Sequence, residues 1–377
     1  MHVGLNMIFL VPGETGGMEV YARELLPSLL AQAPAGVRFT AFINRESAGA
    51  RGGPWHELMP AVTVPVSARN RLQWVAGEQV LLPPLAMRAG VQLVHSLAST
   101  APLSGRFRRV VTVHDLIYAR FPEAHQGLRA KGMSVLVPSA VRRSHRVIAD
   151  SRSTQQDLVA RLGLARERID VVPLGLGAVG REPPAPEQQL RARFGLGDRK
   201  ILLSLSAKRP HKNLLALIDA LALISSQTRP LLVVPGYPTW HEREILQRAN
   251  ERELSDDVRL LPWLSGPDLE GIWAMARAFV FPSLYEGFGL PVLEAMARGV
   301  PVACSNASSL PEVAGEAALL FDPHDRGAIA SAIVHLLRPE VRARLRALGL
   351  ARAREFTWER TAALTLASYA RAFPEPS

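Results

Sequence analysis

Cysteine and long apolar segments are both scarce in this chain of 377 residues. The single cysteine, Cys304, excludes an intramolecular disulfide framework and favours a reducing compartment. No apolar run approaches the roughly 20 residues that cross a bilayer. The start of the chain, MHVGLNMIFLVPGETGG, has neither a basic leader nor a small-residue cleavage site. We therefore expect a cytoplasmic protein without a membrane-spanning helix.

Apolar residues make up 48% of the sequence, enough at this length for two hydrophobic cores. The net charge of +10 is uneven, because residues 1–180 hold 20 Lys or Arg against 12 Asp or Glu, whereas residues 181–377 hold 24 against 22. A basic half is compatible with nucleic acid, an anionic membrane or a phosphorylated substrate, and equally with a merely Arg-rich composition. No nucleic-acid recognition motif accompanies the charge, so we expect no nucleic-acid partner.

Short aliphatic runs alternate with helical patterns in both halves, which is typical of doubly wound parallel α/β sheets. The expected strands of the first half are VGLNMIFLV, VRFTAFIN, VQLVHS, RVVTVHD, RVIADS and IDVVPLG. Those of the second half are KILLSLS, LLVVPG, VRLLPW, AFVFPS, VPVACS and AALLFD. The proline-rich stretch GREPPAPEQQ separates the halves and predicts a linker near residue 180.

Two amphipathic helices are also expected, one after Gly17 and one over residues 357–373, and no strand follows the second. Ligands bind at the carboxyl ends of strands in sheets of this kind. Two such domains facing each other would form a cleft.

The stretch PSLYEGFGLPVLEAMARGVPV, residues 282–302, predicts a strand-to-helix loop that favours an anion. Pro291 suits the first helical position, and Gly299 suits the cap that ends the helix. Glu294 would lie in the first turn and could accept hydrogen bonds from a ribose diol, while Glu286 could reach a sugar or a cation. The ordinary alternatives are a solvated loop glutamate and a first-turn glutamate favoured by the helix dipole.

This stretch resembles the E-x7-E signature of retaining glycosyltransferases of the GT-B fold, the large family called family 4. GETGGMEVYARELLPSLL, VVTVHDLIYARFPE, VIADSRSTQQDL, SLPEVAGEAALLFDP and FTWERTAALTLASYARAF are similar to further segments of that family, so the resemblance covers most of the chain. It implies an acceptor-binding Rossmann-like domain over 1–180 and a nucleotide-sugar-binding one over 181–356. The helix of 357–377 would cross back onto the first domain.

The resemblance also assigns residues of the first half. Gly16 and Gly17 would approach the donor diphosphate or sugar, and His114 would lie at the donor sugar. From its place after a strand, Asp115 could orient that imidazole. His95 ends a neighbouring strand and is a weaker candidate near the acceptor.

In the second half, the family commonly has an arginine at a strand end and a lysine six residues later, both holding the donor diphosphate. Lys212 takes the lysine position, but Ser206 takes that of the arginine, so Lys208 or Arg209 would have to supply the second charge. Trp263 would border the nucleobase and could stack on it, although a structural aromatic is nearly as expected.

The implied reaction is a metal-independent sugar transfer with retention, in which the leaving diphosphate takes the acceptor proton. Glu286 would position the sugar, Glu294 the ribose, and Lys212 the phosphates. The amides of Phe288, Gly289 and Leu290 would assist Lys212, and no cofactor or metal is expected.

Mannosyltransferases of surface-polysaccharide assembly are the most similar subgroup, so GDP-mannose is the expected donor. A glycan end, a lipid-linked glycan or a small metabolite remains open as acceptor. The basic run VRRSHR would permit peripheral contact with the anionic inner face of a membrane, with surface solubility as the rival reading. Alternative functions are a sugar-nucleotide epimerase, a phosphorylase-like enzyme and a non-catalytic nucleotide-binding protein.

Overall fold

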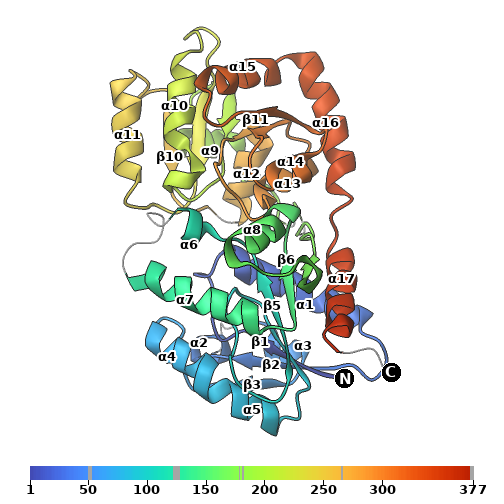
Figure 1. The fold of residues 1–377 in the computed structure, drawn as a ribbon. Coiled ribbons are helices and arrows are strands. Elements are labelled where there is room, and N and C mark those ends of the chain that lie inside the picture. Colours follow the sequence, from blue (N-terminus) through green and yellow to red (C-terminus); the bar gives the residue numbers. More distant parts are fainter. Residues whose placement is uncertain (50–52, 122–127, 178, 181, 265, 374–377) are drawn as a thin grey trace. The chain divides into compact units, whose positions relative to one another are not determined.

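The computed structural model describes residues 1–49, 53–121, 128–177, 179–180, 182–264 and 266–373, with side chains from 132 onward in the third range. The chain divides into two compact units (Figure 1). The first comprises Met1–Gly177 together with Phe356–Ser377, and the second comprises Ala178–Glu355. The chain thus enters the second unit once and returns to the first for its final helix.

A parallel seven-stranded sheet forms the centre of the first unit, with the order β3-β2-β1-β4-β5-β6-β7. The strands are β1 (His2–Asn6), β2 (Arg38–Ile43), β3 (Ala61–Thr63), β4 (Leu93–Ser96), β5 (Arg108–Val113), β6 (Arg146–Ala149) and β7 (Ile169–Val171). All five residues of β1 are buried, as expected for a strand covered on both faces. The sequence predicted every strand except β3, which has only three residues.

Helices connect these strands and cover the sheet (Figure 1). The longer ones are α1 (Gly17–Gln32), α4 (Arg71–Ala76), α5 (Leu82–Arg88), α7 (Leu128–Arg143), α8 (Arg152–Leu162) and α17 (Trp358–Arg371). Shorter ones are α2 (Arg45–Ala48), α3 (Trp55–Leu58), α6 (Ile117–Arg120), the π-helical turn η1 (Gly77–Leu81) and η3 (Arg166–Arg168).

The second unit contains a parallel six-stranded sheet with the order β10-β9-β8-β11-β12-β13. Its strands are β8 (Ile201–Leu203), β9 (Leu231–Pro235), β10 (Val258–Leu261), β11 (Ala276–Phe281), β12 (Val302–Ser305) and β13 (Ala318–Phe321). All six match strands predicted from the sequence. The expectation of two doubly wound parallel sheets is therefore confirmed.

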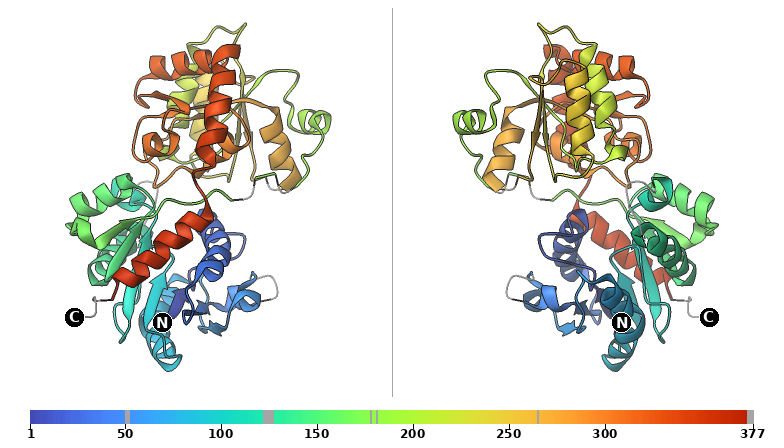
Figure 2. Two further views of the ribbon diagram at one scale, coloured as in Figure 1. Left: turned by 90° about the vertical axis from the view of Figure 1, so that its right-hand side faces the viewer. Right: turned by 90° about the vertical axis from the view of Figure 1, so that its left-hand side faces the viewer.

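The helices of the second unit flank this sheet on both faces (Figure 2). They are α9 (Glu187–Phe194), η4 (Pro210–Lys212), α10 (Leu214–Ala222), α11 (Glu242–Glu251), α12 (Gly266–Met275), α13 (Leu290–Ala297), α14 (Leu310–Ala314), α15 (Arg326–Leu336) and α16 (Pro339–Ala353). None of the helices in the described ranges combines the length and the apolar character needed to cross a membrane.

The final helix, α17, lies beside α1 in the first unit (Figure 2). Its buried hydroxyl groups donate to β7 and to the segment that follows β7. Thr361 Oγ1 donates to the Pro173 carbonyl at 2.8 Å, and Ser368 Oγ donates to the Asp170 carboxylate at 2.7 Å. At Gly175 the backbone passes so close to this helix that a Cβ atom would lie 2.4 Å from the Trp358 nitrogen. The helix is therefore an integral layer of the first unit.

This close approach yields a stability prediction. Gly175→Ala should lower the free energy of unfolding by about 1–3 kcal/mol, because the added methyl group would clash with the start of α17 and displace the helix. Gly177→Ala is the matched control, since its Cβ would meet Glu24 at an ordinary 3.7 Å. Urea denaturation measures both variants. Equal stability of the two would show that α17 does not depend on this contact.

Candidate functional site

In the second unit, the loops that follow β8 and β11 meet at the carboxyl edge of the sheet. These strands are hydrogen-bonded neighbours, so their parallel ends bring residues 74 positions apart into contact. The Leu284 N–H donates to the His211 carbonyl at 2.8 Å. Lys212 Nζ donates to Glu286 Oε1 at 2.6 Å, and both side chains are mostly buried. The sequence singled out both residues, and the structure brings them together.

Two serines that precede α14 form hydrogen bonds with the backbone of the loop that carries Glu286. Ser308 Oγ accepts from the Glu286 N–H at 2.8 Å, and Ser309 Oγ donates to the carbonyls of Glu286 and Phe288. The sequence analysis did not select either serine, because a serine that hydrogen-bonds a neighbouring loop belongs to no recognisable sequence motif. Their effect is to fix the backbone that precedes α13.

Gly289 permits the turn from this loop into α13. Its φ of 117° lies in the left-handed region that favours glycine, and a Cβ atom would lie 2.7 Å from Leu310. The helix then begins at Leu290 with Pro291 in its first turn, one residue earlier than predicted. The N-terminus of a helix presents unpaired N–H groups and a positive dipole end, which together suit an anion.

Glu294 lies one turn into α13 and is partly buried. Its carboxylate forms no hydrogen bond or ion pair with the described residues, because the nearby Arg298 guanidinium is committed to Glu270. Burial raises the pKa of Glu294, and the Arg298 charge opposes that shift. A buried carboxylate without a partner has free acceptor capacity.

The three basic candidates of the loop after β8, which are Lys208, Arg209 and Lys212, differ in their contacts. Lys208 is 1% exposed, and its ammonium donates to the carbonyls of Gly236 and Leu261, both at 2.7 Å. Burial lowers its pKa, and Glu242 opposes that effect. Lys208 therefore ties the loop after β8 to the ends of β9 and β10, and its charge does not point to a ligand.

Arg209 remains as the second cation of this loop. Its side chain is partly exposed and makes no hydrogen bond or ion pair within the described residues. Ser206, which takes the position of an expected arginine, is buried, and its hydroxyl has no hydrogen-bond partner among the described residues. Of Lys208 and Arg209, between which the sequence left the choice open, only Arg209 has a side chain that is not already committed to the protein within the described residues.

Trp263 follows β10 and is 52% exposed, in keeping with a stacking surface. It already stacks on Tyr237, which follows β9, with ring centroids 4.5 Å apart and planes 9° apart. Tyr237 was missed in the sequence, although its place directly after a predicted strand was a usable signal. The two rings form one stacked aromatic pair next to Gly236 and Leu261, whose carbonyls accept from Lys208.

In the first unit, His114 follows β5 and contacts Asp150, which follows the adjacent β6. His114 Nδ1 lies 2.7 Å from Asp150 Oδ2, and Nε2 lies 2.9 Å from the Leu97 carbonyl oxygen. A carbonyl and a carboxylate only accept, so the geometry favours a proton on both ring nitrogens. Burial opposes this charge, but the Asp150 carboxylate outweighs it and raises the pKa of His114.

Asp115 does not orient His114, and that expectation is wrong. Asp115 Oδ1 instead accepts from the Ile117 N–H at 2.9 Å in a tight local turn. Because β6 lies directly beside β5, the residue after β6 reaches the imidazole. Asp150 is the next-to-last residue of the predicted strand RVIADS, as His114 is in RVVTVHD, so the rule that selected His114 would also have selected it.

His95 does not reach the surface, so its expected contact with an acceptor is also wrong. The side chain is fully buried, with Nδ1 2.7 Å from the Tyr369 hydroxyl and Nε2 2.8 Å from Thr112 Oγ1. Burial lowers its pKa to about 3, which keeps the ring neutral. His95 joins β4 and β5 to α17 as a structural residue.

Gly16 and Gly17 lie at the exposed start of α1. Gly16 has a φ of 65° and precedes the helix, and a Cβ atom at either glycine would meet nothing within 4 Å. The space over this helix start is therefore open. Within the described ranges, no group of three or more His, Cys, Asp or Glu side chains is placed to hold a metal ion.

Comparison with known proteins gives matches along both units. The family model "Glycosyl transferases group 1" matches residues 186–349, and "Glycosyltransferase Family 4" matches residues 15–176. O-antigen chain mannosyltransferase B from Escherichia coli is 33% identical over 267 residues, covering 70% of each chain. Serotype-specific mannosyltransferase WbdA from Escherichia coli is 32% identical over 276 residues, covering 70% of this chain and 34% of that protein.

Among solved structures, Anabaena HepE in complex with UDP and glucose superposes with a TM-score of 0.72. The two chains are 20% identical, and the match covers 99% of this chain and 100% of the other. At that identity the likeness concerns the fold alone.

The His114–Asp150 pair yields a pH prediction. A folded-state pKa above the unfolded value means that the protonated pair stabilises the protein fully below about pH 6.5 and loses this effect as pH rises through the folded pKa. Asp150→Asn should lower the pKa of His114 and remove that pH-dependent stability. Histidine NMR titration measures the first effect and denaturation at several pH values the second. A His114 pKa unchanged by the substitution would contradict the assigned partner.

Proposed function

The chain belongs to the group 1 glycosyl transferases of family 4, with the two Rossmann-like domains of the GT-B fold, and from this premise we propose that it transfers mannose from GDP-mannose to a glycan hydroxyl. The similar proteins named above are mannosyltransferases, which transfer a hexose. Mannose is supported by the relatives named as mannosyltransferases, and a glycan acceptor by the O-antigen relative. HepE was solved with UDP, but it shares only the fold.

The observation that carries the proposal is the paired Lys212 and Glu286 beside the start of α13. A departing nucleoside diphosphate develops negative charge, and we infer that the Lys212 ammonium and the helix N-terminus stabilise it. Arg209 supplies the second cation. Trp263 and Tyr237 offer a stacking plate to the nucleobase, and Glu294 offers its free carboxylate to the ribose hydroxyls.

The proposed reaction proceeds with retention and without a protein nucleophile. The bond between the anomeric carbon and the diphosphate oxygen breaks as the acceptor hydroxyl oxygen bonds to the same carbon from the same face. The hydroxyl proton passes to the departing diphosphate. Glu286 holds the sugar through its hydroxyl groups, and Lys212 is shared between Glu286 and the phosphate.

His114 of the first unit is the residue that we propose for a contact with the donor sugar. Both ring nitrogens are committed, to Asp150 and to the Leu97 carbonyl, and the Asp150 carboxylate balances a charge on the imidazole. A direct hydrogen bond to a sugar hydroxyl would require the Leu97 contact to be exchanged. Gly16 and Gly17, with open space above them, allow the substrate to approach the backbone at the start of α1.

A donor screen tests this proposal. The purified protein is incubated with GDP-mannose, UDP-glucose, UDP-N-acetylglucosamine and dTDP-rhamnose, with and without chelator, and thermal stability and released nucleoside diphosphate are measured. We expect stabilisation by GDP-mannose and slow release of GDP that chelator does not suppress. Release from a different donor would correct the sugar and base, whereas loss of release with chelator would refute metal-free transfer. Stabilisation without release even when glycan acceptors are added would favour a non-catalytic nucleotide-binding protein.

A further inference from the structure

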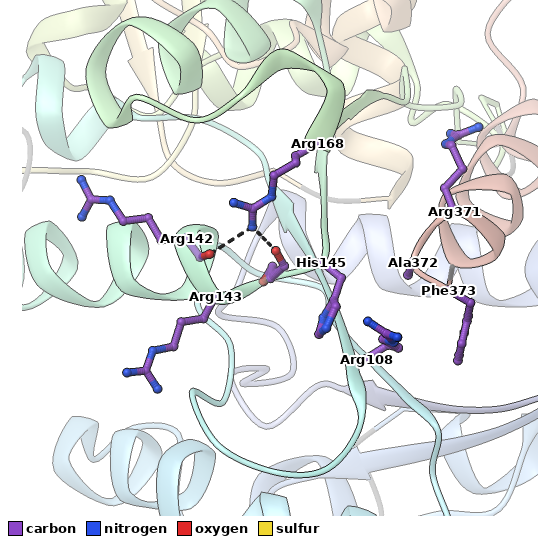
Figure 3. A pocket seen from close by; sticks show the side chains of 9 residues that line it. Arg108, Arg142, Arg143, His145, Arg168, Arg371, Ala372 and Phe373 are labelled. Atoms are coloured by element: carbon purple, nitrogen blue, oxygen red, sulfur yellow. Dashed lines mark hydrogen bonds between the residues drawn. The ribbon is translucent and has the colours of Figure 1, made fainter. Parts of the chain in front are cut away.

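Arginines at the amino edge of the first unit's sheet share no binding space, although several of them line one pocket. The side chains of Arg142 and Arg143 point away from Arg108 (Figure 3). The Arg168 guanidinium donates to the carbonyls of Arg142 and Ser144, and so caps the end of α7. A pocket of the second unit holds its arginines in a different way.

This pocket has a volume of about 690 Å³ and lies at the amino edge of the second unit's sheet. Its lining includes Ala276 and Arg277 at the start of β11, and residues 299–301, which directly precede β12. Residues 179–180 and 182–184 and parts of α12 and α16 contribute most of the rest. Every residue of the lining belongs to the second unit. Pockets of roughly 300–1,000 Å³ are typical of small-molecule sites.

The pocket and the candidate functional site lie at opposite edges of this sheet. Glu286 follows the end of β11, whereas Arg277 lies at its start, and the six residues of the strand separate these ends by about 16–20 Å. The helix α13 begins after the Glu286 loop and ends beside Arg298 and Gly299 of the pocket lining. A small ligand in the pocket would therefore be out of reach of Lys212.

Two arginines of α16 are fixed over the starts of neighbouring strands. Arg342 and Arg346 lie one turn apart, so their side chains project from the same face of the helix. Arg342 Nε donates to the Arg277 carbonyl at 3.3 Å, and Arg346 Nε lies 3.1 Å from the position of a Cβ atom on Gly299. Because β11 and β12 are paired, Arg277 and Gly299 are close together at this edge. The two side chains thus enter the pocket side by side.

The charges of Arg277, Arg342 and Arg346 are near enough to oppose one another. Burial lowers the pKa of Arg342, and the charges of Arg277 and Arg346 lower it further. In the part of the chain that the structure describes, none of the three forms an ion pair with a carboxylate. Like charges held together without a counterion destabilise the folded state, so their gathering requires another reason.

The two carboxylates of the lining are already placed elsewhere. Glu270 pairs with the Arg298 guanidinium through two hydrogen bonds. Glu182 Oε2 lies 2.6 Å from the position of a Cβ atom on Gly266, the first residue of α12. That position is the positive end of the helix dipole, which favours a carboxylate. Because α12 is about 15 Å long, Glu182 is far from Arg277, which follows the other end of the helix.

Helix ends explain one arginine of the pocket and strengthen its positive field. The carboxyl end of α13 favours a cation, and Arg298 meets this preference, since its guanidinium donates to the Glu294 carbonyl at 3.1 Å. The helix α16 begins at Pro339 of the lining, and no side chain caps that end. Its first-turn N–H groups and the positive end of its dipole therefore add to the field of Arg342 and Arg346.

We propose that this pocket binds a small organic phosphate, with its phosphate group held by Arg277, Arg342 and Arg346. Guanidinium groups present planar pairs of N–H donors that match phosphate oxygens, and the bound charge removes the repulsion among the three. The volume leaves room for the rest of such a ligand, and the lining supplies apolar surface to it from Pro183, Pro184, Val300 and Pro301. This binding goes beyond the proposed sugar transfer and does not depend on it.

The first test compares two double variants of the full-length protein that lose the same charge. Arg277→Gln with Arg346→Gln removes two pocket arginines whose side chains donate no hydrogen bond within the described ranges. Arg344→Gln with Arg354→Gln removes two exposed arginines on α16 and directly after it, outside the lining. Calorimetry with glucose 6-phosphate and with pyrophosphate measures binding, and calorimetry with GDP serves as the control for the candidate site at the other edge.

We expect the pocket variant to bind glucose 6-phosphate about tenfold or more weakly than the parent, the loss expected when charged hydrogen bonds are removed. The control variant should match the parent, and the affinity for GDP should be the same in all three proteins. Loss for pyrophosphate as well would show that the phosphate group carries the affinity. Equal losses in both variants, or no binding of either phosphate compound to the parent, would overturn the proposal.

A second measurement locates the bound phosphate in the parent protein. Phenylglyoxal modifies accessible arginines, and mass spectrometry of the peptides identifies which ones react. Glucose 6-phosphate should protect Arg342 and Arg346 and leave Arg209 reactive. Protection of Arg209 alone would place the phosphate at the donor site and overturn the proposal. So would a pocket variant that melts at a lower temperature but binds glucose 6-phosphate normally, since its arginines would then be purely structural.

Discussion

The ion pair between Lys212 and Glu286 is the interaction on which the second unit's site depends. It joins the loops after β8 and β11. The 2.6 Å contact with Glu286 holds the Lys212 ammonium near the loop that leads into α13. Both side chains are mostly buried, so each charge requires a partner of opposite sign, and each side chain supplies that partner for the other. Ser308, Ser309 and the left-handed Gly289 then hold the loop in the one shape that presents both the ammonium and the helix N-terminus. For the proposed function, this arrangement would explain how two residues of opposite charge act in one reaction.

The two edges of the first unit's sheet differ in how their charged side chains are paired. At the carboxyl edge, His114 acquires its charge from Asp150 and is balanced by it. At the amino edge, the Asp170 carboxylate pairs with two guanidinium groups, those of Arg146 and Arg371. The helix α17 contributes to the sheet between these edges, through Tyr369 to His95 and through Ser368 and Arg371 to Asp170. A single helix from the end of the chain therefore stabilises the first unit through contacts with several of its strands.

The sequence predicted the architecture well, because buried parallel strands appear as aliphatic runs and twelve of the observed strands were recognisable in that way. It failed for β3, whose three residues give no periodicity. The candidate site was predicted where function depends on local order along the chain, as for Lys212, Glu286 and the start of α13. It was missed where function depends on which strands are neighbours: Asp150 reaches His114 only because β6 lies beside β5, and Lys208 turns inward only because Gly236 and Leu261 offer carbonyls there. His95 ended a strand like His114, but the returning helix α17 covers it, and no local pattern predicts that burial.

The most direct test of the account is the affinity for GDP of three proteins: the parent, Lys212→Met and Glu286→Gln. If Lys212 is held by Glu286 and shared with the diphosphate, GDP should bind about tenfold or more weakly to Lys212→Met, since a charged hydrogen bond is lost. Glu286→Gln should bind GDP at least as tightly as the parent, because the ammonium is released from its partner, although sugar transfer should fall. Unchanged GDP affinity in Lys212→Met, or a comparable loss in both variants, would contradict the claim that this pair forms the phosphate site.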